Sequence, residues 1–254
     1  PNPDPHPHSL TDPFQAMAGG GHEHEHELKL VGMWASPFVT RAKLALHLKG
    51  LGYEYVEEDL GCKSELLLSS NPVHKTVPVL IHRGRPVCES HLIVQYIDEA
   101  FATAGSPSLL PADPYERATA RFWAAYVDDK VLQPWRGVFR ARTDEERAAW
   151  MEQATAAGAL EGVLAGGKEG EFFFGGDSVG YVDVLLGGVL PWVRATAAVT
   201  GDELFDAART PLLAAWMERF GELDAAKAVF QDVDKLVDYA KMLMALFAAG
   251  PADK

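Results

Sequence analysis

Residues 71–98 read NPVHKTVPVLIHRGRPVCESHLIVQYID, and this stretch decides the fold of the first part of the chain. Two short apolar runs, Val77–Ile81 and Pro86–Cys88, flank the turn segment His82–Arg85. Apolar runs of this length around a glycine-containing turn predict a β-hairpin. Pro78 has no N–H for a strand ladder, so we expect it at a strand start or edge, where a cis bond in a tight turn is one option.

The apolar pattern changes to helical spacing directly after Cys88, at Leu92, Val94, Tyr96 and Ile97. Glu89 and Ser90 therefore lie at a switch from strand to helix. The N–H groups at a helix start bind anions, so a carboxylate and an anion-binding helix end meet at one point. Such a pair can hold a small zwitterion. A serine that only caps the helix, beside a solvated glutamate, is the alternative.

Composition limits the classes of protein that this chain can belong to. It has 254 residues, enough for one large or two modest domains, and an apolar share of 48%. The net charge of -13 argues against nucleic acid as a partner. No apolar run approaches the ~20 residues of a membrane span, and no secretory signal opens the chain, so no membrane partner is expected. Cys62 and Cys88 are too few for a disulfide scaffold and indicate a reducing, cytoplasmic compartment.

Residues 1–27 are predicted to be a disordered tail. His22, His24 and His26 alternate with glutamates, a tract that can bind metal and that also resembles an affinity tag. Met17 is a plausible native start, which would make residues 1–16 an addition or upstream sequence. We assign no metal site to the tail and leave it out of the fold prediction.

Residues 28–101 are predicted to form a thioredoxin-like α/β domain. The expected strands are Leu28–Met33 and Tyr53–Glu57, with a helix between them that ends at Lys49-Gly50. A strand, a helix and a strand form a parallel βαβ unit. A short helix over Leu66–Ser70, the hairpin and its helix complete the order β-α-β-α-β-β-α.

Ser36 and Lys63 are candidate functional residues of this domain. Ser36 precedes Pro37, a pattern typical of a helix N-cap followed by proline at the first helical position. A hydroxyl at a helix N-terminus can stabilise a thiolate, although plain capping explains the same pattern. Lys63 is either a surface charge or an anchor for a carboxylate.

Residues 102–113 are predicted to be a linker, and residues 114–254 an all-helical domain. Helices are expected over Tyr115–Arg142 with a kink at Pro134, Asp144–Leu164, Tyr181–Val199, Thr210–Phe220 and Val233–Ala248. Phe172–Phe174 is the single candidate strand. The helix from Tyr181 is almost entirely apolar, so it should be central and buried, with Gly180 as N-cap and Asp183 three residues later.

The chain resembles a cytosolic glutathione transferase, and it is most similar to the plant tau class. The resemblance covers about residues 28 to 248 and rests on several motifs in the same order across both domains. The matching segments are Ala35–Val39 with Arg41, Lys63–Leu68, Asn71–Lys75, Val77–Leu80, Cys88–Ser90, Val94–Ile97, Arg121–Ala124 with Tyr126–Asp128, and Phe174–Asp177 with Asp183.

This resemblance implies a mechanism in which Ser36 hydrogen-bonds the glutathione sulfur and favours the nucleophilic thiolate. It implies that Glu89 binds the γ-glutamyl ammonium and that Ser90 with its helix N-terminus binds the γ-glutamyl carboxylate. Lys63 would pair with the glycyl carboxylate. Val77 would offer backbone hydrogen bonds to the cysteinyl part, with Pro78 in the cis form. Glutathione is then a co-substrate, and no cofactor is expected.

The family pattern also implies an apolar pocket for the electrophile against the helical domain. Its expected walls are Trp34, Phe38, Leu132, Arg136, Phe139, Trp192, Tyr239, Leu243 and Leu246. Aromatic residues at helical spacing are as consistent with a core as with a pocket.

Three departures from the tau pattern stand out. Thr76 occupies a position where many tau proteins have a basic residue, which could cost about 1–2 kcal/mol of glutathione affinity. Leu132 replaces a usual aromatic and precedes Pro134. Gly187-Gly188, with Pro191, interrupts the buried helix, so the pocket could be larger or more mobile than usual.

Two alternatives to a conjugating enzyme stay open at this point. One is a low-turnover carrier of flavonoid-like or other apolar acids, although a carrier has no need of a thiolate site. The other is a redox enzyme of the same fold, which would need a cysteine where Ser36 stands. The family places its sites beside a two-fold interface, so a homodimer is expected.

Overall fold

The computed structural model describes residues 28–102, 108–155, 158–167 and 173–249. Its first part is a four-stranded mixed sheet with strand order β2-β1-β3-β4. The strands are β1 (Leu28–Gly32), β2 (Glu54–Glu57), β3 (Val79–His82) and β4 (Arg85–Cys88). β1 pairs with β2 in parallel and with β3 antiparallel, as the predicted βαβ unit and hairpin require.

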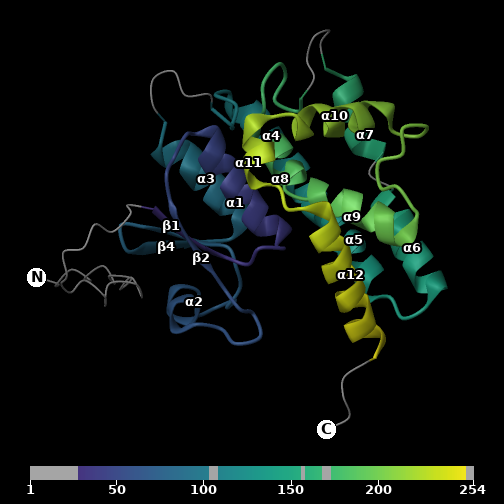
Figure 1. The fold of residues 1–254 in the computed structure, drawn as a ribbon. Helices are drawn as coiled ribbons and strands as arrows, with labels where there is room; N and C mark the ends of the chain where they lie inside the picture. The colour runs from purple at the N-terminus through teal and green to yellow at the C-terminus, as the bar shows by residue number, and fades with distance from the viewer. Residues whose placement is uncertain (1–27, 103–107, 156–157, 168–172, 250–254) are drawn as a thin grey trace, which may run out of the picture.

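Three helices cover the sheet, α1 (Pro37–Leu48), α2 (Glu65–Ser70) and α3 (Ser90–Ala100). Figure 1 shows α1 and α3 together on one side of the sheet and α2 on the other, so the thioredoxin-like prediction is confirmed. The predicted tail, residues 1–27, lies outside the described residues.

The hairpin turn is tighter than predicted, because only Arg83 and Gly84 connect the two strands. Both have positive φ, 51° and 75°, which is the backbone of a type I′ turn. The Val77–Pro78 peptide bond is cis, as the sequence allowed. β3 begins at Val79, directly after this proline, rather than at Val77.

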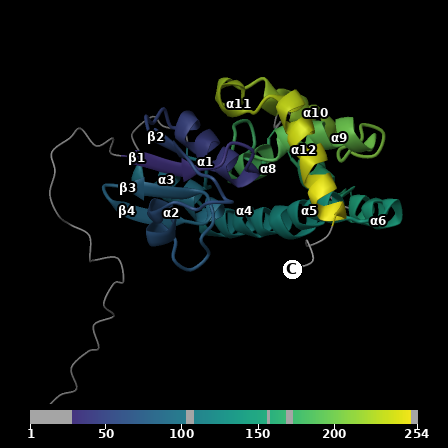
Figure 2. The ribbon, with the colours of Figure 1, turned by 60° about the horizontal axis from the view of Figure 1, so that its bottom comes forward.

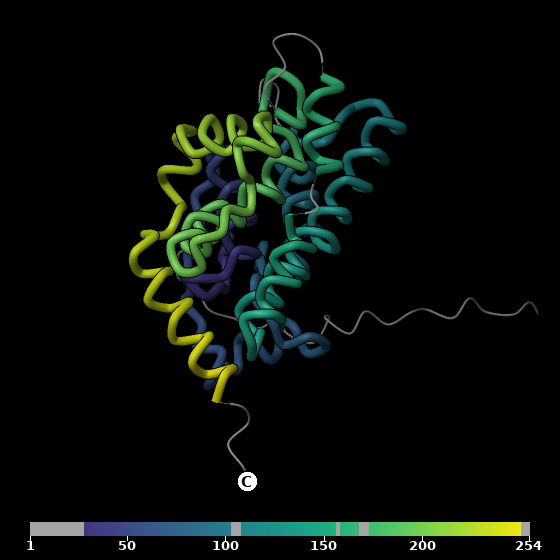
Figure 3. The backbone as a smooth tube through the Cα atoms, turned by 90° about the vertical axis from the view of Figure 1, so that its right-hand side faces the viewer, coloured from purple at the N-terminus to yellow at the C-terminus, as the bar shows by residue number. Residues whose placement is uncertain are grey.

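The helical part packs beside the α1 and α3 side of the first domain, as Figure 2 shows. Its helices are α4 (Pro114–Tyr126), α5 (Gln133–Arg140), α6 (Asp144–Thr155), α7 (Gly158–Ala165), α8 (Tyr181–Gly187), α9 (Leu190–Thr200), α10 (Pro211–Gly221), α11 (Asp224–Val229) and α12 (Val233–Ala248). In Figure 3, α12 forms the yellow edge of the molecule that leads to the C-terminus, and it packs against α9 and α5.

Several predicted helix boundaries were wrong. The helix predicted over Tyr115–Arg142 contains a π-helical segment, Val127–Leu132, because Pro134 cannot donate to a carbonyl one turn earlier. The helix predicted over Asp144–Leu164 corresponds to α6 and α7, and residues 156–157 between them lie outside the described residues. The described part of Phe172–Phe174 makes no strand, only an isolated bridge between Phe173 and Gly176. The six residues of α11 were not predicted.

The apolar helix predicted over Tyr181–Val199 is two helices, α8 and α9, with a break at Gly188-Val189. A Cβ on Gly188 would lie 2.5 Å from Arg41 Cγ and 2.8 Å from the Pro37 carbonyl oxygen. Glycine therefore lets α1 approach the break. We expected no apolar run long enough to span a membrane, but residues Tyr181–Thr200 are long and apolar enough to do so. However, 78% of their apolar window is buried inside the protein. This is the burial expected of core helices.

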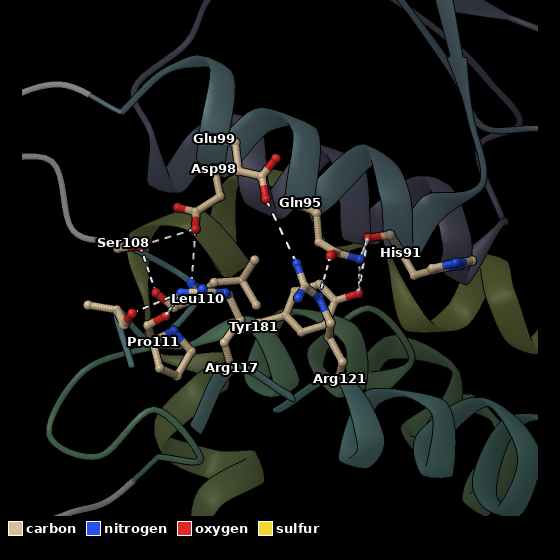
Figure 4. A network of polar contacts seen from close by, with 11 residues as sticks. His91, Gln95, Asp98, Glu99, Ser108, Leu110, Pro111, Arg117, Arg121 and Tyr181 are labelled. Atoms are coloured by element: carbon tan, nitrogen blue, oxygen red, sulfur yellow. Dashed lines mark hydrogen bonds and ion pairs between the residues drawn. The ribbon is translucent and has the colours of Figure 1, made fainter. Parts of the chain in front are cut away.

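Polar contacts from α3 connect it to the segment predicted as a linker (Figure 4). The Asp98 carboxylate accepts hydrogen bonds from the Leu109 and Leu110 N–H groups at 2.8 and 2.9 Å, and it pairs with Lys49 Nζ at 2.7 Å. Burial opposes the charged form of Asp98, but these donors hold its pKa below the usual range.

Nearer the N-terminus of α3, a second set of contacts reaches α4 and α8 (Figure 4). Gln95 accepts from Arg121 Nε at 2.8 Å and donates to the Tyr181 hydroxyl at 3.0 Å. That hydroxyl donates to the His91 carbonyl at 3.1 Å. The two parts of the protein therefore meet across a satisfied polar interface on this side of α3.

Candidate active site

Ser36 stands at the N-terminus of α1, as the Ser-Pro pattern predicted. Its Oγ accepts a hydrogen bond from the Val39 N–H at 3.3 Å, and Pro37 occupies the first turn. Among the described residues, no acceptor takes the proton of this hydroxyl. Ser36 is 9% exposed and lines a cleft, so its hydroxyl can donate to an atom bound there. The helix dipole of α1 favours negative charge at the same point.

Glu89, and not Ser90, occupies the N-cap position of α3. Glu89 has φ 70° and ψ 116°, a conformation that is uncommon for residues other than glycine and that clusters at functional sites. Neither residue caps the helix through its side chain in the described structure. The first N–H groups of α3 therefore have no side-chain cap, and the binding of an anion there stays a prediction.

The buried side chain of Arg41 ties Ser90 to the helical domain. Its Nη1 donates to Ser90 Oγ at 3.3 Å, its Nη2 pairs with Asp128 Oδ1 at 2.6 Å, and its Nε donates to the Leu185 carbonyl at 2.8 Å. Arg41 is fully buried. All three contacts are needed to satisfy a guanidinium removed from water.

Two loops bring cations to the same cleft. Asn71 shapes the first, since its Nδ2 donates to the Thr76 carbonyl at 3.0 Å and its Oδ1 accepts from the His74 N–H at 3.1 Å. The buried carboxylate of Glu58 shapes the second by accepting from both the N–H and the hydroxyl of Ser64, at 2.6 and 2.7 Å. These bonds place Lys63 and Lys75 at the cleft.

The cleft has a volume of about 530 Å³ and lies between the first domain and the segment around the π-helical turn. Its lining residues are Ser36, Phe38, Leu60, Lys63, Lys75, Thr76, Val77, Pro78, Glu89, Ser90, His91, Asp128, Leu132, Gln133 and Arg136. Cations from the loops and carboxylates from Glu89 and Asp128 both border it. The arrangement can hold a ligand that carries an ammonium and carboxylates around a central nucleophile.

Comparisons with known proteins agree with this geometry. Residues 26–99 match the model of the glutathione S-transferase N-terminal domain, and residues 140–219 match that of the C-terminal domain. A probable glutathione S-transferase of Oryza sativa subsp. japonica, GSTU6, is 57% identical over 85% of this chain and 94% of its own length. This chain belongs to the glutathione S-transferase family. Glutathione S-transferase U17 of Arabidopsis thaliana is 46% identical to this transferase over 85% of the chain and 95% of the relative.

Solved structures place this transferase in the tau class. The tau-class glutathione S-transferase from mango is 44% identical, has a TM-score of 0.79 and covers 85% of this chain and 98% of its own. A rice glutathione S-transferase solved in complex with glutathione is 39% identical, with a TM-score of 0.78 and coverage of 88% and 99%. The predicted family, fold and transferase activity are confirmed, and the carrier alternative is not favoured.

All six residues predicted to bind or activate glutathione line this cleft: Ser36, Lys63, Val77, Pro78, Glu89 and Ser90. Of the predicted electrophile pocket, Phe38, Leu132 and Arg136 line it too. Burial and the nearby charge of Arg140 both lower the pKa of Arg136.

The structure does not bring the other predicted pocket residues into this cleft. Trp34 and Tyr239 meet edge to face at 5.5 Å and line a separate groove of about 380 Å³ with α12 residues. Phe139 and Trp192 are buried in an aromatic cluster with Trp135, with ring centroids 5.2–5.4 Å apart. Leu243 packs against the core, and Leu246 is 62% exposed.

Sequence reasoning missed several residues of the cleft, above all Asp128. Asp128 ends a segment that matches the family pattern, but its spacing alone does not distinguish it from a surface charge on a helix, because its partner Arg41 lies in the other domain. Lys75 belongs to the Asn71–Lys75 segment that matches the family pattern, and it lines the cleft without a predicted role. His91 follows Ser90 directly and could have been found as the next residue of the helix start.

Proposed function

We propose that this transferase conjugates the glutathione thiolate to apolar electrophiles, with the Ser36 hydroxyl as the group that stabilises the thiolate. The observation that carries this proposal is that Ser36, at the N-terminus of α1, lines the same cleft as the Glu89 carboxylate and the cations Lys63 and Lys75. Support also comes from the rice relative solved in complex with glutathione.

The proposed position of glutathione follows from charge. Its γ-glutamyl ammonium would lie against Glu89, and its γ-glutamyl carboxylate against Ser90 and the first N–H groups of α3. Its glycyl carboxylate would lie toward Lys63, with Lys75 bordering the same cleft. The backbone at Val77-Pro78 would bind the cysteinyl part. Each charged group would then meet an opposite charge or a donor.

Ser36 would act on the equilibrium between thiol and thiolate. A free cysteine thiol has a pKa of ~8.5, and helix N-termini with polar donors lower it. Each pKa unit corresponds to about 1.4 kcal/mol in favour of the thiolate. The single hydroxyl proton would be donated to the sulfur because Ser36 Oγ already accepts from Val39.

The electrophile would bind beside Ser36 against Phe38, Leu132 and Arg136. Trp34, Phe139, Trp192, Tyr239, Leu243 and Leu246 stay predictions of the family pattern as further walls. No cofactor is proposed.

We propose a homodimer in the cytoplasm. The exposed apolar side chains of Leu92 on α3 and Phe122 on α4 support a contact surface, and both described cysteines are free thiols. Sedimentation at the monomer mass would contradict the dimer.

The test is conjugation of glutathione to a chlorinated nitroaromatic by the wild type and by Ser36→Ala, with glutathione binding measured by calorimetry. We expect Ser36→Ala to keep binding but to lose about tenfold in kcat/KM near neutral pH for each unit by which the thiol pKa rises. Ser69→Ala is the matched control, because this exposed α2 serine does not line the cleft.

Three other results would change the proposal. Binding of glutathione with no turnover of any electrophile in either protein would indicate the carrier. Full activity of Ser36→Ala would remove Ser36 from the mechanism. Absence of glutathione binding in the wild type would show that the site has decayed, with Thr76 the first residue to restore to a lysine.

A further inference from the structure

The backbone of the loop before α1 is held by side chains at three consecutive carbonyls. Gln231 Nε2 donates to the Trp34 carbonyl at 2.7 Å. Trp192 Nε1 donates to the Ala35 carbonyl at 2.6 Å. Thr40 Oγ1 donates to the Ser36 carbonyl at 3.1 Å. Two of these donors come from the helical domain, although the loop belongs to the first domain.

Gln231 connects these contacts into a chain. Its Nε2 also donates to Thr40 Oγ1 at 2.8 Å, and Thr40 then donates its own proton to Ser36. The orientation of the amide is fixed, because the Trp34 carbonyl can only accept and so must face the nitrogen. Gln231 Oε1 is left buried without a hydrogen-bond partner in the described structure. A buried polar atom left unpaired is rare and calls for an explanation.

None of the three donor side chains lines the cleft. Gln231 lies between α11 and α12, Trp192 is in α9, and Thr40 is fully buried in α1. Their common target is the backbone from Trp34 to Ser36, and within it the Ser36 hydroxyl is the group proposed to act on the thiol.

We propose that Gln231, acting with Thr40 and Trp192, is a positioning residue that sets the direction of the Ser36 hydroxyl. This rests on the proposed role of Ser36 in stabilising the thiolate. The Ser36 N–H donates to the Met33 carbonyl at 3.0 Å. Because the Ser36 carbonyl is held as well, the backbone on both sides of Ser36 is fixed, and its Cα–Cβ bond can point in only one direction. A hydroxyl held in this way is preorganised for the sulfur.

The proposal separates thiolate formation from glutathione binding. The groups proposed to bind the charged ends of glutathione, Lys63, Glu89 and Ser90, receive no contact from Gln231. Loss of the Gln231 donor should therefore raise the thiol pKa of bound glutathione and leave its dissociation constant unchanged. A purely structural role would change thermal stability without moving the pH dependence.

The decisive variant is Gln231→Met, which keeps the length of the side chain and removes its donors. We expect the pH midpoint of kcat/KM to rise by about half a unit to one unit, and kcat/KM below that midpoint to fall about three- to tenfold. Gln153→Met, at an exposed position of α6, is the matched control and should leave both unchanged. Circular dichroism and thermal melting verify that each variant folds.

A second pair of variants tests the same chain without touching Gln231. Thr40→Ser keeps the hydroxyl that relays the contact and should keep the wild-type midpoint, whereas Thr40→Val should raise it. Equal midpoints for these two variants would overturn the proposal. So would a folded Gln231→Met with a wild-type midpoint.

The double variant Ser36→Ala with Gln231→Met distinguishes failure of this inference from failure of the proposed function. If Gln231 acts through Ser36, the double variant should have the same midpoint as Ser36→Ala alone. Additive effects would overturn the positioning role and leave Ser36 in place. A wild-type midpoint in Ser36→Ala itself would remove the role of Ser36 and the positioning role together.

Discussion

Replacing Asp183 by alanine tests the anchor of the buried helix α8. The Asp183 side chain is fully buried, and its carboxylate accepts four hydrogen bonds. The donors are the N–H groups of Phe174, Gly175 and Gly180, at 2.9, 2.9 and 2.8 Å, and Nε1 of Trp216 at 2.7 Å. One side chain therefore holds the turn before α8, the start of α8 and a core tryptophan of α10.

The expected cost follows from the donors left behind. A buried donor without an acceptor costs about 1–3 kcal/mol, and the turn around the exposed Gly175 can relax toward water, so we expect about 4 kcal/mol in total. For a protein of this size, about 4 kcal/mol lowers the melting temperature by roughly 8–16 °C. Asp177→Ala is the control, because Asp177 lies in the same turn and is exposed.

The effect should depend on pH. Burial raises the pKa of Asp183 to about 6 from its usual 3.8, although its four donors favour the charged form. A carboxyl whose pKa is raised on folding stabilises the protein below its unfolded pKa, and this contribution is lost as pH rises through 6. The shift of about two units corresponds to about 3 kcal/mol. The free energy of unfolding of the wild type should therefore exceed that of Asp183→Ala by more at acidic than at neutral pH.

Urea unfolding followed by far-UV circular dichroism measures these differences without relying on the fluorescence of Trp216. A loss of less than about 1 kcal/mol for Asp183→Ala would refute the reasoning, because four orphaned donors could not then be buried. A difference that grows as pH rises would show that the sign of the pKa shift is wrong.

Three further predictions concern the site and its supports. Gly188→Ala should destabilise the protein by about 1–3 kcal/mol in chemical denaturation, because its Cβ would meet Arg41 and the Pro37 carbonyl, while an alanine at the exposed Gly162 serves as control. Glu89→Gly should leave stability unchanged or raise it by up to about 1 kcal/mol, since φ 70° suits glycine, yet weaken glutathione binding about tenfold or more in calorimetry; a loss of stability would contradict the strain argument. Thr76→Lys should tighten glutathione binding about five- to tenfold at low salt, and this gain should shrink as salt is added; a gain that is independent of salt would exclude a charge effect.

The features that could be predicted from sequence are those fixed by neighbouring residues. Arg83-Gly84 determines the hairpin turn, and Ser36-Pro37 determines the start of α1. Gly187-Gly188 determines the break in the buried helix. The π-helical segment could not be predicted, because the apolar spacing continues through it. The helix α11 has only six residues, too few for a periodic pattern to be recognised.

The site shows the same limit. The glutathione residues lie on motifs whose local geometry orients them, and the structure gathers all six in one cleft. Phe139 and Trp192, predicted as pocket walls, are buried in an aromatic cluster, and an aromatic residue at helical spacing looks the same in a core as in a pocket. Gln231 and Asp128 have contacts that join positions far apart in the chain, which no local pattern reveals.

The fully buried guanidinium of Arg41 makes the two parts of this protein energetically inseparable. Its partner Ser90 lies in the first part, but Asp128 and the Leu185 carbonyl lie in the second. A fragment that ends before α4 would lose two of these three partners together with the α8 packing that keeps Arg41 out of water. The halves should therefore melt in a single cooperative transition, and chimaeras that exchange helical halves between relatives should fold only where the incoming half supplies both acceptors.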